Sequence, residues 1–136
     1  MSRWRRWSIF ILVIVLAAEG IAYRYLRQRQ AFEEKARNHW LRGQLAYYES
    51  SYRQAITEYA TLVEDFSASF YAVDGLYELA HCYYLVKDYG KAYRVIERLN
   101  LEHPGSFYQP FVDDYLRTSI PPEWKSRYRR REKESE

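Results

Sequence analysis

Three histidines and one cysteine are the imidazole and thiol side chains of this 136-residue chain that could bind a metal ion, and the thiol could also act as a nucleophile. His81 and Cys82 are neighbours, so on a helix they would point about 100° apart and could not share a metal ion in the usual way. His39 and His103 lie far from both in the sequence. A single cysteine excludes an internal disulfide, and Cys82 falls in a predicted core helix, where we expect its thiol to be inert. These residue types therefore predict no metal site.

Neighbouring carboxylates occur as Glu33-Glu34 and Asp113-Asp114, and both pairs are typical of solvated helix faces rather than of acid–base dyads. The chain also lacks a glycine-rich phosphate loop. Its formal net charge of +3 is too small to predict a polyanion partner by itself. We therefore expect a protein that is not an enzyme, with no catalytic residue, cofactor, metal, small-molecule substrate or nucleic-acid partner.

The elements that must position the remaining side chains come from a repeat between Arg37 and Pro104. A shift of 37 residues, from Gly43 to Ala80, aligns similar residue types along this stretch. The other aligned pairs are Ala46 with Tyr83, Tyr52 with Tyr89, Ala55 with Ala92, Tyr59 with Ile96, Leu62 with Leu99, and Ser67 with Pro104. A third copy begins where Phe70-Tyr71 recurs as Phe107-Tyr108. Self-similarity at this period predicts stacked supersecondary units.

Each copy contains two helical patterns joined by a short break. In the second copy the first helical face is formed by Leu76, Leu79, Ala80 and Tyr83. After the turn at 87–90, the second face is formed by Ala92, Ile96 and Leu99, and His103-Pro104-Gly105 ends that helix. We expect the small residues at Gly43/Ala80 and Ala55/Ala92 to let antiparallel helices approach closely.

This pattern resembles the tetratricopeptide repeat (TPR) family. The second copy keeps the family's spacing from Leu76 to Pro104. The first copy keeps Gly43, Ala55 and Tyr59, but the usual Trp, Leu, Tyr and Pro are replaced by His39, Arg42, Ala46 and Ser67. The repeat is also longer than the usual length of about 34 residues, with the excess in 66–73. This lengthened form resembles the TPR domains of bacterial envelope proteins, such as outer-membrane-assembly lipoproteins.

The resemblance implies an all-α fold, a short TPR-like solenoid of helical hairpins with about two and a half repeats. We expect the TPR-like domain at 37–120, with repeats at 37–67 and 74–104 and a partial one at 107–118. A charged tail at 121–136 follows Pro121-Pro122. Its Arg129-Arg130-Arg131 could touch phosphate or anionic lipid, but the interspersed glutamates favour a solvated tail.

The N-terminal 25 residues predict a single transmembrane helix. A basic flank at 1–6 precedes the apolar run Ile9–Ala18, and no cysteine follows that would mark a lipoprotein signal. Trp4 and Trp7 lie on one side of the run and Tyr23 and Tyr25 on the other, as interfacial aromatic belts do. From residue 7 to residue 25 a helix covers about 28 Å, enough to cross the hydrocarbon. The competing interpretation is a signal peptide cleaved after Ala18 or Ala22.

Two features of this segment leave alternatives open. Glu19 either lies near the far interface beside Arg24 or makes a polar contact to another membrane helix. Arginines flank both sides of the span, so they do not fix its orientation. The likeness to envelope TPR proteins favours a bacterial inner-membrane protein with its repeats on the periplasmic side. The connector at 26–36 has no Gly or Pro, so we expect it to be helical and to hold the repeats at a fixed height.

The remaining functional candidates are surfaces. In TPR superhelices the first helix of each repeat lines the concave side, which implies a partner-binding surface that we name the predicted binding face. Its members are Arg37, Trp40, Gln44, Tyr47, Asp74, Tyr77, His81 and Tyr84. Amphipathic aromatic residues suit peptide partners, although some of these rings could simply pack between repeats. The set does not match the basic clamp of chaperone-type TPR domains.

The C-terminal end of the stack is the second expected surface. Two and a half repeats leave its last helical pattern without a second helix to cover it. The aromatic residues that we expect to be exposed there are Phe107, Tyr108, Phe111 and Tyr115.

Three functions compete on this basis. The first is a membrane-anchored scaffold that binds a partner protein as an accessory or assembly subunit of a larger complex. The second is a secreted TPR adaptor released by signal cleavage. The third is a tail-driven binder of anionic lipid or another polyanion.

Overall fold

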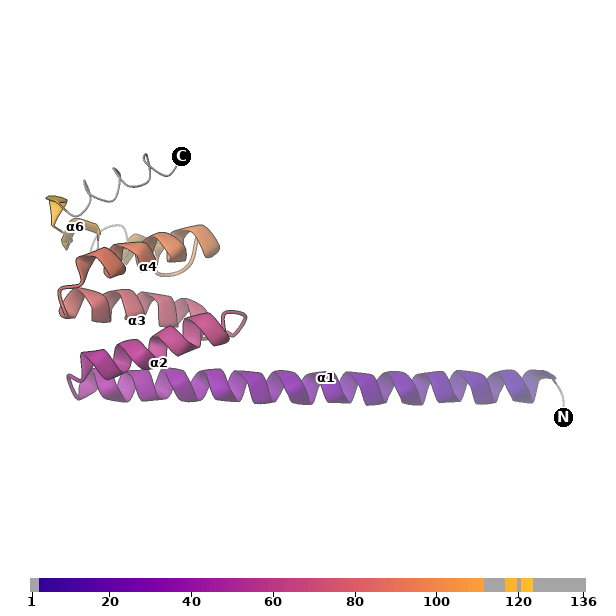
Figure 1. The fold of residues 1–136 in the computed structure, drawn as a ribbon. Helices are drawn as coiled ribbons and strands as arrows, with labels where there is room; N and C mark the ends of the chain where they lie inside the picture. The colour runs from indigo at the N-terminus through magenta and orange to yellow at the C-terminus, as the bar shows by residue number, and fades with distance from the viewer. Residues whose placement is uncertain (1–2, 112–116, 120, 124–136) are drawn as a thin grey trace. The chain divides into compact units, whose positions relative to one another are not determined.

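The computed structural model describes residues 3–111, 117–119 and 121–123, and all regular secondary structure in these residues is helical. The expectation of an all-α chain is therefore confirmed for this part of the sequence. The helices are α1 (Arg3–Tyr48), α2 (Tyr52–Asp65), α3 (Ala72–Leu85), α4 (Tyr89–Glu102), α5 (Gln109–Phe111) and α6 (Arg117–Ser119), as Figure 1 shows. The chain divides into two compact units, residues 1–34 and 35–136.

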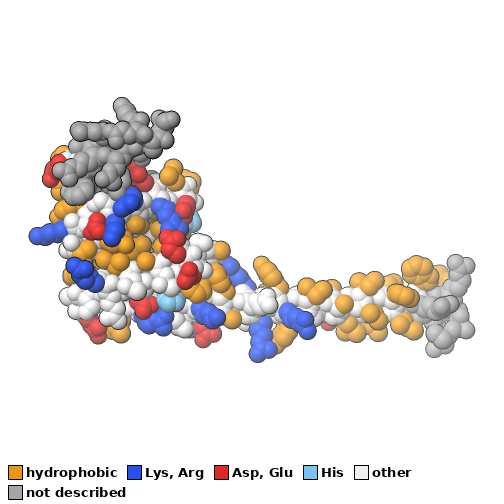
Figure 2. Space-filling model, in the orientation of Figure 1, with side chains coloured by type: hydrophobic (Ala, Val, Ile, Leu, Met, Phe, Trp, Pro, Cys, Tyr) orange, Lys and Arg blue, Asp and Glu red, His pale blue; other side chains and the backbone are white. Residues whose placement is uncertain are grey.

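The N-terminal unit consists of the first part of α1, and its side chains are exposed from Ile9 to Gln28. Figure 2 shows hydrophobic side chains along the N-terminal part of this helix, followed by Lys and Arg side chains. The helix is long and apolar enough to cross a membrane, a criterion that a signal sequence at the same position would also meet. Residues 26–36 lie within α1. Near the end of the unit, Arg29 pairs with Glu33 at 2.7 Å and lies over the ring of Phe32.

The second unit repeats its geometry every 37 residues. Helix α4 begins and ends 37 residues after α2, and α3 ends 37 residues after α1. In Figure 1, α2, α3 and α4 follow one another as a stack of antiparallel helices. The sequence period therefore corresponds to a period of the backbone.

The turns that join the paired helices are alike in detail. Ser50 and Lys87 occupy the same repeat position, and both adopt the left-handed backbone region, with φ of 60° and 62°. In the first turn, Ser50 N donates to Tyr47 O at 2.9 Å and Ser51 N donates to Ala46 O at 2.8 Å. In the second turn, the matching bonds are Lys87 N to Tyr84 O and Asp88 N to Tyr83 O, both at 2.9 Å. In each case the bonds satisfy carbonyls that the end of the helix leaves without an intrahelical partner.

The core of this unit lies between successive helices. The largest side chains that it buries completely are Tyr59, Leu62, Val63, Leu76, Cys82, Ile96 and Leu99. Ala55, Ala80 and Ala92 are also fully buried. Helix α1 approaches α2 closely at Gly43, where an added Cβ would lie 2.5 Å from Cε1 of Tyr59. The close approach therefore places a glycine against a large ring, rather than two small residues against each other.

The third copy begins as the first two do. Ser106 N donates to His103 O at 3.1 Å, just as Ser69 N donates to Phe66 O at 2.9 Å. Helix α5 then begins at Gln109, 37 residues after the start of α3. The expected pair Asp113-Asp114 and the tail from 124 to 136 lie outside the described residues.

Candidate partner-binding face

The predicted binding face combines side chains from α1 and α3. Arg37 is exposed, and the other seven members are partly buried. Two contacts join the helices across this face. Gln44 Nε2 donates to Glu78 Oε1 at 3.3 Å, and the rings of Tyr47 and His81 lie 5.6 Å apart. The structure thus brings together two rows that are 37 residues apart in the sequence.

Some of the aromatic rings on this face also pack against other parts of the repeat unit. The Trp40 ring lies 5.8 Å from Tyr71, and the Tyr84 ring lies 5.7 Å from Tyr89. Trp40 and Tyr77 are in contact with the hydrophobic core. These residues therefore contribute to folding in addition to any role in binding.

The third copy extends the same face through Tyr108. Its ring stacks on Tyr77, with centroids 4.4 Å apart and planes inclined by 17°. Its hydroxyl donates a hydrogen bond to the Asp74 carboxylate, and burial together with this bond raises the pKa of Tyr108. Sequence analysis expected Tyr108 to stand exposed at the end of the stack, but it is half-buried on α3.

The electrostatics of the face are dominated by two carboxylates on α3. Burial raises the pKa of Glu78, the bond from Gln44 opposes this shift, and the charge of Asp74 adds to it. Burial lowers the pKa of His81, which favours the neutral imidazole. The face therefore offers carboxylates, a neutral imidazole and hydroxyl-bearing rings, with the exposed Arg37 on α1.

Glu78, Tyr71 and Tyr108 belong to this surface but were not assigned to it from the sequence. Glu78 lies four residues after Asp74 on α3, so helical spacing places both on one side. Tyr71 and Tyr108 share one repeat position, which was the available signal for a common role.

At the C-terminal end of the described repeat unit, Phe107 is 80% exposed and Phe111 is 50% exposed. Their rings lie 5.9 Å apart. Tyr115, the fourth residue expected here, lies outside the described residues.

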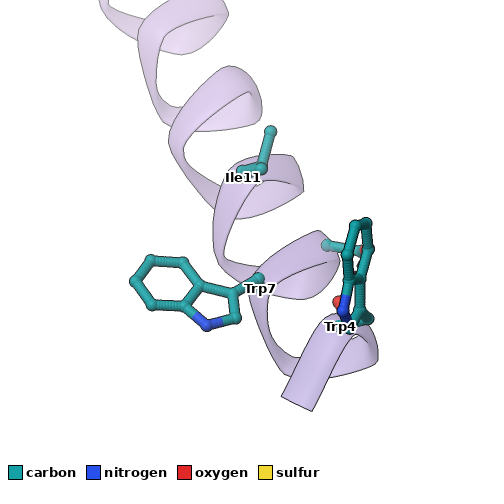
Figure 3. A pocket seen from close by; sticks show the side chains of 4 residues that line it. Trp4, Trp7 and Ile11 are labelled. Atoms are coloured by element: carbon teal, nitrogen blue, oxygen red, sulfur yellow. Dashed lines mark hydrogen bonds between the residues drawn. The ribbon is translucent and has the colours of Figure 1, made fainter. Parts of the chain in front are cut away.

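The side chains assigned to the membrane segment are all exposed, namely Trp4, Trp7, Glu19, Tyr23 and Tyr25. Trp4, Trp7, Ser8 and Ile11 line an open hollow of about 760 Å³ on the surface of α1. In Figure 3 the rings of Trp4 and Trp7 point away from each other. Since these residues belong to one helix turn and its neighbour, the hollow is a gap between exposed side chains rather than an enclosed site.

His39 and Cys82 occupy separate places in the repeat unit. His39 Nδ1 lies 2.8 Å from Glu58 Oε2, and Arg42 Nε donates to the same oxygen at 3.1 Å. Cys82 is buried, and burial raises the pKa of its thiol to about 12. A thiol with such a pKa is a poor nucleophile at neutral pH.

No model of a known protein family, no curated protein and no solved structure matches this chain.

Proposed function

We propose that this protein is a membrane-anchored scaffold of the TPR type, which binds a partner protein and holds it at the membrane. The apolar part of α1 is the anchor, and the repeat unit is the binding module. The chain would act as an accessory or assembly subunit of a larger complex, without chemistry of its own. The likeness to envelope TPR proteins favours the bacterial inner membrane, with the repeats on the periplasmic side.

The observation that carries this proposal is the pairing of the α1 and α3 rows. Gln44 contacts Glu78, and Tyr47 contacts His81, so one surface extends across both hairpins and continues to Tyr108. Rings that combine apolar area with a polar atom bind peptides well, because few torsions must be immobilised. A surface of this length suits an extended or helical segment of a partner.

Anchoring is supported by the composition and exposure of α1. The apolar residues from Ile9 to Leu16 are each between 46% and 67% exposed, so no other part of the described chain covers them. Trp and Tyr residues flank the apolar run, as they do in membrane spans. A secreted adaptor remains the second candidate, because a signal sequence has the same position and length. The intact mass of the mature protein distinguishes the two, since cleavage after Ala18 or Ala22 would remove the apolar run.

The binding face is tested by isolating the full chain with its partners from native membranes, after cross-linking and identification by mass spectrometry. We expect Arg37→Glu to reduce recovery of the principal partner about tenfold, equivalent to roughly 1.4 kcal/mol. Trp40→Ala and Tyr77→Ala should weaken capture as well, while the helical circular dichroism signal persists.

A charge reversal elsewhere provides the control. Arg53 is exposed on α2, whereas the predicted binding face is formed by α1 and α3, so Arg53→Glu should leave recovery unchanged. Normal capture by Arg37→Glu, Trp40→Ala and Tyr77→Ala together would show that the partner binds another surface.

A further inference from the structure

The face of α1 that points away from its own hairpin partner is exposed and mostly apolar. We name the set Asn38, Leu41, Leu45 and Tyr48 the outer face of α1. Leu41 is 49% exposed, Leu45 is 59% exposed and Tyr48 is 79% exposed. Their spacing of four and then three residues places them in one stripe along the helix.

The repeat identifies the counterpart of this stripe in α3. Adding 37 to each residue number gives Gly75, Glu78, Cys82 and Leu85. Gly75 and Cys82 are buried, and Glu78 and Leu85 are partly buried. The same face is therefore covered in α3 and open in α1.

Helix α2 is what covers the face of α3. An added Cβ at Gly75 would lie 2.7 Å from Leu62 Cδ2 and 3.1 Å from Val63 Cγ1, so the two helices are in close contact. Tyr59 of α2 and Cys82 of α3 belong to the same buried hydrophobic cluster. The cover is thus an antiparallel helix that presents aliphatic side chains.

No helix among residues 3–111, 117–119 and 121–123 occupies the corresponding place on α1. The residues that would correspond to α2, 37 positions earlier, are 15–28, and these belong to α1 itself. A terminal repeat that ends in water normally has a polar outer face. Here the opposite holds, because leucines stand in α1 where α3 has Glu78 and Cys82.

We infer that the outer face of α1 binds an amphipathic helix of a partner protein, which runs antiparallel to α1 and takes the place that α2 takes on α3. This interface continues the stacking of the repeat unit by one helix. Exposed Glu49 borders the stripe at its C-terminal end. A complementary helix would carry a basic residue opposite Glu49.

This surface differs from the predicted binding face, and the two can be tested separately. The probe is a membrane-impermeant maleimide, applied to single-cysteine variants of the full chain in which Cys82 is replaced by Ala. We expect Leu45→Cys to react about tenfold more slowly in native membranes than in purified protein, if about nine in ten chains carry the partner helix. Leu101→Cys is the matched control, because Leu101 is an apolar residue of α4 that is 82% exposed. It should react equally fast in both preparations.

The segment that binds the outer face of α1 is identified with a photo-cross-linking amino acid placed at position 41 or position 48. We expect adducts with one amphipathic helix of another protein, in which the residue joined to position 48 precedes the residue joined to position 41. Adducts with α1 of a second copy, adducts with residues 124–136 of the same chain, or protection without any protein adduct would each overturn the inference. Equal reactivity of Leu45→Cys in both preparations would also overturn it. None of these outcomes depends on Arg37→Glu or on the partner bound at the predicted binding face.

Discussion

The two helical hairpins of the repeat unit share a backbone but hold their helices together by different chemistry. In the second hairpin, Leu76 and Leu79 are buried. In the first, the equivalent residues are His39 and Arg42, which both bond to Glu58 of α2. Since 58 plus 37 is 95, the counterpart of Glu58 is Val95, which packs against the core. The same three positions of the hairpin thus hold a polar cluster in the first copy and an aliphatic cluster in the second.

A second difference lies at the closest approach of the paired helices. The first hairpin combines Gly43 with Tyr59, whereas the second combines Ala80 with Ile96. All four residues are buried. The smaller residue faces the larger one in the first hairpin, so the two hairpins preserve the combined volume rather than the individual residues.

The largest loss of stability is expected at a position where both hairpins have the same buried residue. Ala55 and Ala92 share a repeat position, and both are completely buried. Replacing either by Trp forces an indole into a filled crossing, so we expect Ala92→Trp and Ala55→Trp each to cost more than about 4 kcal/mol and to unfold the unit. Thermal unfolding followed by circular dichroism measures this. If only one variant unfolds, the two crossings are not equivalent.

The next largest effect on stability tests whether the Gly43–Tyr59 pair can be replaced by the Ala–Ile pair of the second hairpin. Gly43→Ala should destabilise the protein by about 1–3 kcal/mol, because the new methyl group would overlap the Tyr59 ring. Combining it with Tyr59→Ile reproduces the pair found in the second hairpin and should recover part of that loss. Urea unfolding of the single and double variants gives the coupling energy. Strict additivity would show that the two residues do not interact.

The polar cluster should make the stability of the first hairpin depend on pH. Burial alone would raise the pKa of Glu58, but hydrogen bonds from His39 and Arg42 outweigh it and leave the pKa below the ordinary value of 4.5. Glu58 therefore contributes stability above pH 4.5 that is lost as the pH falls through its folded-state pKa.

Removing this carboxylate should consequently destabilise the protein most at neutral pH. We expect Glu58→Val to cost about 1–2 kcal/mol at pH 7, because it leaves His39 and Arg42 without their acceptor. The difference from the wild-type protein should shrink in acid. The triple variant H39L/R42L/E58V copies the aliphatic cluster and should restore stability at pH 7. A triple variant as unstable as Glu58→Val would contradict the equivalence of the two clusters.

The smallest effect concerns the shared turn. Ser50 and Lys87 both have positive φ, which costs a residue with a side chain about 1–2 kcal/mol, partly offset by the entropy that glycine loses on folding. We expect Ser50→Gly and Lys87→Gly each to stabilise the protein by about 0.5 kcal/mol. Denaturant midpoints measure the gain. Unequal gains would indicate that the two turns differ in strain despite their matching hydrogen bonds.

The repeat and its helical pairs were accessible from the sequence because they depend on periodicity. Apolar spacing and the break at 87–90 predicted two helices per copy, and α3 and α4 begin and end within a few residues of those patterns. Small residues also indicated where the helices approach. The partner of Gly43 was not predictable in this way, because the alignment of Tyr59 with Ile96 does not show which residue of α1 the Tyr59 ring contacts.

The side-chain contacts between elements were less accessible. Glu58 lies 19 residues from His39 and 16 from Arg42, so no local spacing connects them. Tyr108 was assigned to an open end because its own helix pattern stops, yet it stacks on Tyr77 of the preceding copy. In both cases the deciding contact joins different helices, and a periodic pattern describes only one helix at a time.

The identical turns at Ser50 and Lys87 determine which parts of this chain can be exchanged. The loops that follow the two hairpins also match, since Ser69 N donates to Phe66 O and Ser106 N donates to His103 O, so residues 72–108 could be duplicated as a block. A single helix could not be exchanged in this way. Replacing α4 by α2 would set Tyr59 against Ala80, whose methyl group occupies the space that Gly43 leaves open for the ring. The hairpin, rather than the helix, is therefore the module by which such a chain can lengthen.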